Sequence, residues 1–124
     1  MNILIVDDSI VIRKINTNVV KSIVPNAKIF QAENGAEALT ILTPNNPKMF
    51  DLMLLDFNMP HMSGLEILKA LQKMDEFIDL PIIMVTTESH RTLVIEMIKL
   101  GVVDYLTKPF SAEDFRFKII KHTS

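Results

Sequence analysis

The chain has 124 residues, of which 48% are apolar and 23% charged, so we expect one soluble globular domain rather than a disordered chain. It has no cysteine, which excludes disulfides, cysteine-based metal sites and a thiol nucleophile. The formal net charge is −2 and the basic residues are spread along the chain, so no nucleic-acid binding is expected. The apolar start of the chain reaches Asp7 and Asp8 too soon for a signal peptide or a membrane span, and a cytoplasmic location is expected.

Five short apolar runs alternate with five amphipathic stretches along the sequence. The first run, Asn2–Val6, is continuous rather than alternating, which is typical of a strand covered on both faces. Ser9 is the predicted N-cap of a helix over about 10–23, which Pro25 closes. The apolar residues that recur at helical spacing in this stretch are Ile12, Ile15, Val19 and Ile23.

The middle of the chain repeats this order twice. The run over 28–32 is less apolar and is predicted nearer a sheet edge, and the run over 52–55 ends abruptly at Asp56. The Asn34-Gly35 turn precedes a short helix, and 43–47 is a loop by composition. A second helix fades near Asp75. The apolar positions expected on these two helices are Ala36, Leu39 and Leu42 in one, and Leu65, Ile67, Leu68 and Leu71 in the other.

The last third of the chain contains two more such pairs. The run over 82–85 leads to a helix over about 90–100, which Gly101 ends. The run over 102–106 leads to a helix with a capping-box-like start, Ser111 and Asp114. Phe115 and Ile119 are predicted on its inner face with Ile120 nearby, and residues 122–124 are predicted to fray.

Strands that alternate with helices predict an α/β fold, in which a parallel sheet carries helices on both faces through right-handed crossovers. The carboxyl ends of all five strands then lie on one rim. Polar residues stand at or just after four of these ends, so we expect them to converge: Asp7, Asp8, Asp56, Thr86 and Lys108.

Three carboxylates on one rim repel one another, by roughly 4 kcal/mol for two charges 4 Å apart at an effective dielectric near 20. Raised pKa values or a bound cation would relieve this repulsion. Oxygen ligands without histidine or cysteine favour a hard ion such as Mg²⁺, with Mn²⁺ as an alternative. Asp56 could then attack a metal-bound phosphoryl group and form an aspartyl phosphate, while Lys108 and Thr86 bind phosphoryl oxygens.

Each of these residues also has a plainer interpretation. Asp56 could cap the following turn, Asp7 and Asp8 could favour the start of the first helix, and Lys108 could form a surface ion pair. Thr86 suits a strand end by propensity. Their joint position at strand ends favours the site. The eight methionines are read as core filler, and His61, His90 and His122 as surface residues.

The motifs together resemble the receiver domain of bacterial two-component response regulators over essentially the whole chain, and are similar to its stand-alone chemotaxis members. The resemblance implies a single receiver domain over 1–124 with a doubly wound (βα)5 flavodoxin-like fold and strand order 2-1-3-4-5. The matching motifs are Asp7-Asp8, Asp56, Met59-Pro60-His61-Met62-Ser63-Gly64, Thr86, and Asp104-Tyr105-Leu106-Thr107-Lys108-Pro109-Phe110.

The resemblance also implies roles for individual residues. Asp56 would accept a phosphoryl group from a histidine kinase or phosphotransfer protein, or from a small acyl phosphate. Asp7, Asp8, Asp56 and the backbone carbonyl of Asn58 would surround Mg²⁺. Thr86 and Lys108 would contact the phosphoryl group, Tyr105 would be the aromatic switch residue, and the Lys108–Pro109 bond would be cis.

The fourth helix, fifth strand and fifth helix are the expected surface for a downstream protein or output domain, through which a phosphorylated monomer docks or pairs. No membrane is expected to take part. Asn58 and Glu88 match the residue types of the stand-alone chemotaxis regulator, which implies a short-lived phosphoryl state. Thr87 departs from the small residue usual in the family, and its branched side chain could narrow access to Asp56.

The sequence argues against three other interpretations. A Mg²⁺-dependent phosphatase of the haloacid dehalogenase type would need a different acidic motif after the first strand and room for a cap domain. A flavin-binding protein would need loops rich in hydroxyl and aromatic side chains. A receiver that only binds partners would not need the intact acid set.

Overall fold

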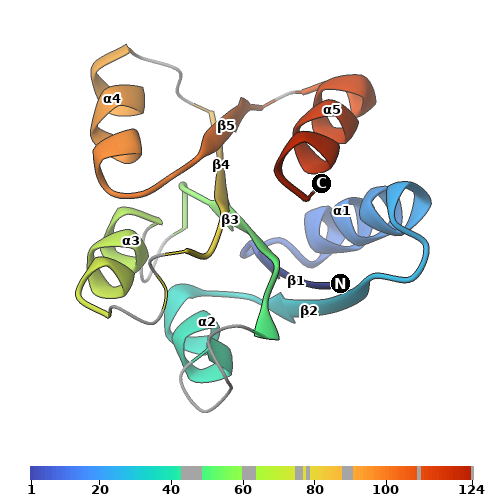
Figure 1. Cartoon of the computed structure of the whole chain (residues 1–124), viewed down its shortest axis with the longest axis horizontal. Helices are drawn as coiled ribbons and strands as arrows, with labels where there is room; N and C mark the ends of the chain where they lie inside the picture. Colours follow the sequence, from blue (N-terminus) through green and yellow to red (C-terminus); the bar gives the residue numbers. More distant parts are fainter. Residues whose placement is uncertain are drawn as a thin grey trace.

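The computed structural model describes residues 1–42, 49–59, 64–74, 77, 79–87, 91–108 and 110–123. Five parallel strands form one sheet in the order β2-β1-β3-β4-β5, and helices lie on both of its faces (Figure 1). This confirms the expected α/β class and strand order. The elements are β1 (Asn2–Val6), α1 (Ile10–Ile23), β2 (Lys28–Ala32), α2 (Gly35–Leu42), β3 (Leu52–Asp56), α3 (Gly64–Gln72), β4 (Ile82–Thr86), α4 (Arg91–Lys99), β5 (Asp104–Thr107) and α5 (Ala112–Thr123).

The sheet is buried on both faces. Successive side chains of a strand point to opposite sides, so the continuous apolar runs of the central strands supply apolar side chains to both faces. Ile3 and Ile5 of β1 pack into a core cluster with residues of α1 and α5. Leu4 and Val6 pack into a second cluster with residues of α2, α3 and α4. In Figure 1, α1 and α5 lie together on one side of the sheet, while α2, α3 and α4 cover the other. Burial of these two faces fixes the strand register.

The α1 helix has the predicted bounds but not the predicted buried stripe. Its buried residues are Arg13, Asn16, Thr17 and Val20. Ile15 is 51% exposed. Ile12, Ile15 and Val19 instead line an apolar groove between α1 and the start of α5. Helical spacing alone cannot tell a stripe that faces the sheet from one that faces a neighbouring helix.

Several element boundaries and faces also differ from the sequence-based expectation. β3 and β4 each include the polar residue at their end, and β5 begins at Asp104 rather than 102. Residue 102 is instead part of the turn that closes α4. In α2 the buried position is Ala38 rather than Ala36. The end of α5 does not fray within the described residues, since Thr123 still donates a hydrogen bond to the carbonyl of Ile119. Phe115 and Ile119 are buried on the inner face of this helix as predicted, and Ile120 is exposed.

Three predicted helix ends are confirmed by their hydrogen bonds. The Ser9 hydroxyl accepts from the backbone N–H of Ile12, and the Ser111 hydroxyl accepts from that of Asp114. Gly101 has φ 101°, and the backbone N–H of Val102 reaches the carbonyl of Met97. That pattern is a Schellman ending, which favours glycine because it needs a left-handed residue.

Some sequence-based expectations concern residues outside the described ranges. The loop at 43–47, the helix start at His90 and the final residue Ser124 are among them. The α3 helix ends at Gln72, before the expected end near Asp75. Within the described part of the chain, no helix combines the length and apolar character that crossing a bilayer requires.

Gly64 allows the start of α3 to approach the end of β3 closely. A Cβ atom on this residue would lie 2.9 Å from the Cα of Phe57 and 3.2 Å from the carbonyl oxygen of Asp56. Both neighbours are backbone atoms of the strand end, so they cannot turn away as a flexible side chain could. The backbone N–H of Gly64 also donates to the carbonyl of Phe57.

We therefore expect Gly64→Ala to lower the free energy of unfolding by about 1–3 kcal/mol through overpacking, measured by urea denaturation. Gly101→Ala is the matched control, because nothing lies within 4 Å of its Cβ position and only backbone strain is added. There asparagine should be better tolerated than alanine, since it adopts left-handed conformations more readily. At Gly64, asparagine should be worse than alanine. A neutral Gly64→Ala variant would contradict the close approach.

Candidate functional site

The parallel register brings the polar strand ends to one rim of the sheet, and backbone hydrogen bonds hold them there. The N–H of Asp7 donates to the carbonyl of Ala32 on β2, at 3.1 Å. The N–H of Lys108 donates to the carbonyl of Thr86 on β4, at 2.7 Å. These bonds extend the sheet by one residue past its strands, so the side chains start from a rigid backbone.

Three predicted site residues form a compact acidic group on this rim. Asp7, Asp8 and Asp56 can each offer a carboxylate oxygen such that all three atoms lie within 4.8 Å of one another. Asp7 is 3% exposed and Asp56 is 2% exposed, while Asp8 is exposed to solvent. The Oδ1 atom of Asp7 accepts the N–H of Ser9 at 2.9 Å, which turns the carboxylate toward the rim. The expected convergence of the acids is confirmed.

Lys108 joins the acidic group from the end of β5. Its Nζ atom lies 3.0 Å from Oδ1 of Asp56 and 3.8 Å from Oδ2 of Asp7. The lysine side chain remains a quarter exposed, so its ammonium group contacts both the buried carboxylates and the solvent. Within the described ranges, Lys108 is the one residue ion-paired with this group, and it pairs with Asp7 and Asp56 but not with Asp8, so the group retains an excess of negative charge.

The local charge and burial perturb two of the acids. Burial raises the pKa of the Asp7 carboxyl above its ordinary value, with the negative charge of Asp56 adding to the effect. Burial also raises the pKa of Asp56, although the hydrogen bond and charge of Lys108 oppose this. A divalent cation would relieve the same repulsion. The oxygen donors and the excess negative charge thus fit a hard ion such as Mg²⁺.

A family model described as the response regulator receiver domain matches residues 3–120 of the chain. This chain belongs to that family. It is 38% identical over 119 residues to a chemotaxis protein CheY homolog of Campylobacter jejuni, covering 96% of this chain and 89% of the relative. It is 37% identical over 121 residues to the chemotaxis protein CheY of Pseudomonas aeruginosa, covering 98% and 94%. The solved structure of the chemotaxis response regulator CheY4 of Vibrio cholerae has a TM-score of 0.84 and 31% identity, covering 99% and 98%.

Family membership confirms the resemblance and the assignment to two-component signalling. CheY-like receiver domains are signalling proteins that interact with kinases and downstream targets, and they do not turn over an external substrate. Receiver domains bind Mg²⁺ at an acidic pocket, and the acidic group of this receiver domain could hold such an ion. The phosphatase and flavin interpretations are set aside in favour of the receiver family.

Asn58 links two loops above the acids of this receiver domain. Its backbone N–H donates to Oδ1 of Asp56 at 3.1 Å. Its side-chain oxygen accepts the backbone N–H of Thr87 at 3.0 Å and the Thr87 hydroxyl at 3.2 Å. The hydroxyl of Thr86, whose residue is 3% exposed, lies 3.5 Å from the same oxygen. The sequence singled out Asn58, Thr86 and Thr87 but gave no sign that they contact one another.

Arg13 is a site neighbour that the sequence analysis missed. Its guanidinium group is buried, donates to the backbone carbonyl of Asp7 at 2.5 Å, and reaches the Gln31 side chain at 3.3 Å. The arginine therefore fixes the first acidic strand end from the core side and adds positive charge behind it. Its acceptor is a backbone atom, so no pairing of residue types in the sequence could have indicated it.

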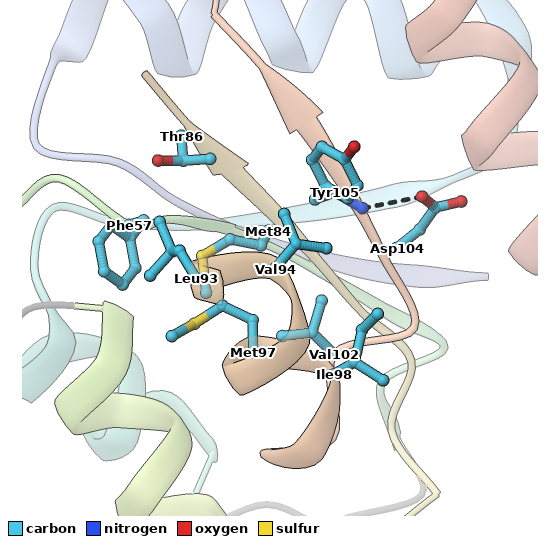
Figure 2. A pocket seen from close by; sticks show the side chains of 10 residues that line it. All are labelled: Phe57, Met84, Thr86, Leu93, Val94, Met97, Ile98, Val102, Asp104 and Tyr105. Carbon is cyan, nitrogen blue, oxygen red and sulfur yellow. Dashed lines mark hydrogen bonds between the residues drawn. The ribbon is translucent and has the colours of Figure 1, made fainter. Parts of the chain in front are cut away.

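Tyr105, the expected switch residue, borders a small apolar cavity between α4 and the sheet. The cavity has room for about one water molecule. Figure 2 shows Thr86 and Tyr105 at the same end of the cavity, with Leu93, Val94 and Met97 of α4 around it. Thr86 and Tyr105 of the receiver domain thus line the same small cavity.

An ionic cluster ties α5 to the strand of Tyr105. Asp104 accepts hydrogen bonds from Lys118 at 3.1 Å and from His122 at 2.9 Å. Lys118 also donates to the carbonyl of Tyr105, and its Nζ atom lies 4.7 Å from the centre of the Tyr105 ring. Although burial opposes it, these contacts hold the pKa of Asp104 below its ordinary value. His122, interpreted from the sequence as a surface residue, is instead partly buried and pairs with Asp104.

Some predicted site residues lie outside the described ranges, and their roles stay predictions. These are Glu88, Pro109 with its expected cis bond, the motif residues at 60–63, and the histidines His61 and His90. Four buried methionines agree with the core-filler interpretation, namely Met53, Met59, Met84 and Met97.

The raised pKa of Asp7 predicts a pH-dependent stability. A carboxyl whose pKa is higher in the folded state than in the unfolded state stabilises the fold when it is protonated. Its contribution to the free energy of unfolding therefore falls as the pH rises from the pKa of the unfolded state to that of the folded state. Asp7→Asn keeps an acceptor for Ser9 but removes the charge. In metal-free buffer we expect this variant to unfold at a higher urea concentration than the parent at neutral pH. The difference should vanish below the ordinary pKa of the carboxyl.

Asp79→Asn is the matched control, because Asp79 is exposed and far along the chain from the acidic group. It should leave the urea midpoint nearly unchanged at both pH values. If Asp7→Asn were instead less stable than the parent at neutral pH, the charge repulsion inferred for this group would be wrong.

Proposed function

We propose that residues 1–124 act as one receiver domain, a phosphorylation-dependent switch whose phosphoacceptor is Asp56. One observation carries the proposal: the Asp56 carboxylate lies at a strand end within an acidic group and 3.0 Å from the Lys108 ammonium. The sheet fixes the Asp56 backbone, while the open side of the group admits a donor. A turn-capping role alone would not require two further acids and a lysine.

In the proposed step an Asp56 oxygen attacks the phosphorus of a phosphohistidine on a histidine kinase or phosphotransfer protein. The new P–O bond forms as the P–N bond breaks, and the imidazole leaves with that electron pair and takes up a proton. With a small acyl phosphate the carboxylate is the leaving group instead. Lys108 would neutralise one phosphoryl oxygen, and Thr86 would donate a hydrogen bond to another.

Asp7, Asp8, Asp56 and the backbone carbonyl of Asn58 are the proposed ligands of Mg²⁺, with Mn²⁺ as an alternative. A divalent ion there would neutralise charge on the phosphoryl group as it approaches the acids. The raised pKa values of Asp7 and Asp56 support a cation at this position, since both indicate carboxylates whose charge is poorly compensated by protein groups alone.

Output would pass through α4, β5 and α5, which we call the output face. Phosphorylation adds negative charge and acceptor oxygens beside Thr86. Movement of Thr86 would open space for Tyr105 beside the small cavity, and Lys118 and Asp104 would transmit that movement to α5. The exposed apolar residues of this region suit a protein partner or output domain: Ile95, Ile98, Val103, Phe117 and Ile120.

The proposal also includes the remaining expectations from the sequence. Asn58 and Glu88 would set the lifetime of the phosphoryl group, and a cis bond before Pro109 would aim Lys108. The switch would act in the cytoplasm as a monomer that docks onto a partner, or pairs, when phosphorylated.

The phosphoacceptor assignment is tested by incubating the protein with acetyl phosphate and Mg²⁺ and measuring its intact mass. We expect one added phosphoryl group on the parent and none on Asp56→Asn. Chelation of the metal should abolish the addition. Asp8→Asn should weaken Mg²⁺ binding by about tenfold or more, equivalent to about 1.4 kcal/mol, measured by calorimetry.

Asp51→Asn serves as the control for Asp56→Asn, because Asp51 precedes the same strand but lies at its opposite end. This variant should be phosphorylated like the parent. An unmodified parent, or an equally modified Asp56→Asn variant, would remove the central assignment.

The output assignment predicts where phosphorylation changes amide hydrogen exchange. Because Thr86 leads toward α4 and Tyr105 lies in β5, exchange should change most in the output face. The exchange of α2 should change little, because α2 follows β2, which lies at the opposite edge of the sheet from β5. Mass-spectrometric exchange with and without phosphorylation checks this. Changes confined to α1 and α2 would exclude the proposed route.

A further inference from the structure

The side-chain oxygen of Asn58 has three donors around it, and two of them belong to Thr87. The Thr87 backbone N–H is 3.0 Å away and the Thr87 hydroxyl 3.2 Å away. The third, the Thr86 hydroxyl, is more distant at 3.5 Å. One amide oxygen therefore joins the residues that follow β3 to those that follow β4, next to Asp56.

The orientation of the Asn58 amide follows from these contacts. A backbone N–H can only donate, so the Asn58 atom that faces Thr87 must be the oxygen and not the nitrogen. The Thr87 hydroxyl can then add a second hydrogen bond to the same oxygen, which has two lone pairs. Thr87 is thus well suited to hold Asn58 in one position.

This arrangement competes with the proposed phosphorylated state. The Thr86 hydroxyl has a single proton, so it cannot donate to Asn58 and to a phosphoryl oxygen at the same time. The phosphorylated state takes Thr86 away from Asn58, but the two bonds from Thr87 still join the loops. Because Thr86 and Thr87 are neighbours in the chain, movement of Thr86 relative to Asn58 would strain those two bonds.

We propose that Thr87 is a positioning residue, whose hydroxyl latches Asn58 in the unphosphorylated state and so slows phosphorylation of Asp56. The inference rests on the proposed function. The hydrogen bond of the Thr87 hydroxyl, and not the size of the side chain, would slow the phosphorylation of Asp56. The latch acts before transfer, so it affects phosphorylation and leaves the loss of the phosphoryl group nearly unchanged.

Three substitutions separate the hydroxyl from the bulk of the side chain. Thr87→Val keeps the branched shape and removes the hydroxyl. Thr87→Ser keeps the hydroxyl and removes a methyl group. Thr87→Ala removes both. The phosphorylation rate constant is measured for each with acetyl phosphate and Mg²⁺, and the rate of phosphoryl loss is measured separately after the donor is removed.

We expect Thr87→Val and Thr87→Ala to be phosphorylated about fivefold faster than the parent, as for the loss of one hydrogen bond worth about 1 kcal/mol. Thr87→Ser should stay within about twofold of the parent. All four proteins should lose the phosphoryl group at rates within about twofold. A general disturbance of the loop would instead change both rates.

Asn58→Ala provides an independent test of the latch. It removes the side-chain oxygen that accepts from Thr87 but keeps the Asn58 backbone carbonyl, which is a proposed Mg²⁺ ligand. Adding Thr87→Val to Asn58→Ala should give no further acceleration, since the latch is already absent. A full fivefold effect in that background would show that the Thr87 hydroxyl acts on another group, and would overturn the proposal.

Two further outcomes would show that the Thr87 hydroxyl does not control phosphorylation. If Thr87→Ser and Thr87→Ala are fast and Thr87→Val resembles the parent, bulk controls access and the latch is wrong. Equal rates for all four proteins would also exclude it. Those two results would leave Asp56 as the phosphoacceptor, whereas a parent that takes up no phosphoryl group would remove the proposed function and the latch together.

Discussion

The buried acidic group is the constraint around which this receiver domain is organised. Asp7 and Asp56 end two adjacent strands, so the parallel register itself forces their carboxylates together. Lys108, from a strand two places further along the sheet, supplies the one ammonium group that the described residues place within ion-pair distance of both. Carboxylates held this close destabilise the fold unless something positive joins them. The fold thus maintains a locally unfavourable charge arrangement that a bound cation can relieve.

The core provides the rigidity that this arrangement needs. β1, β3 and β4 are almost wholly apolar and buried on both faces, and their side chains divide between two packed clusters. A shift of one residue in the pairing of a strand would move each of its side chains to the opposite face of the sheet. Because both faces are packed, this shift is unfavourable, and the position of each strand end is fixed. The polar residues at the rim therefore keep their positions without needing hydrogen bonds to one another.

Much of this could be predicted from the sequence, because continuous apolar runs and their polar ends depend on local patterns. The alternation of elements, the two serine caps, and the meeting of Asp7, Asp8, Asp56 and Lys108 are of this kind. Contacts away from the strand ends, between side chains of distant segments, could not be predicted. The buried Arg13 donates to a backbone carbonyl, and His122 pairs with Asp104, which lies eighteen positions earlier. The stripe of Ile12, Ile15 and Val19 has helical spacing whichever neighbour it faces.

The contact of Arg13 with the Asp7 carbonyl makes the two sides of the site mechanically unequal. On the side of α1, a buried guanidinium group anchors the strand end to a helix in the core. On the opposite side, Asn58 and Thr87 are exposed and joined mainly by hydrogen bonds. A displacement toward α1 would have to break a buried contact, whereas a displacement on the side of Asn58 would break only exposed hydrogen bonds, which water can replace.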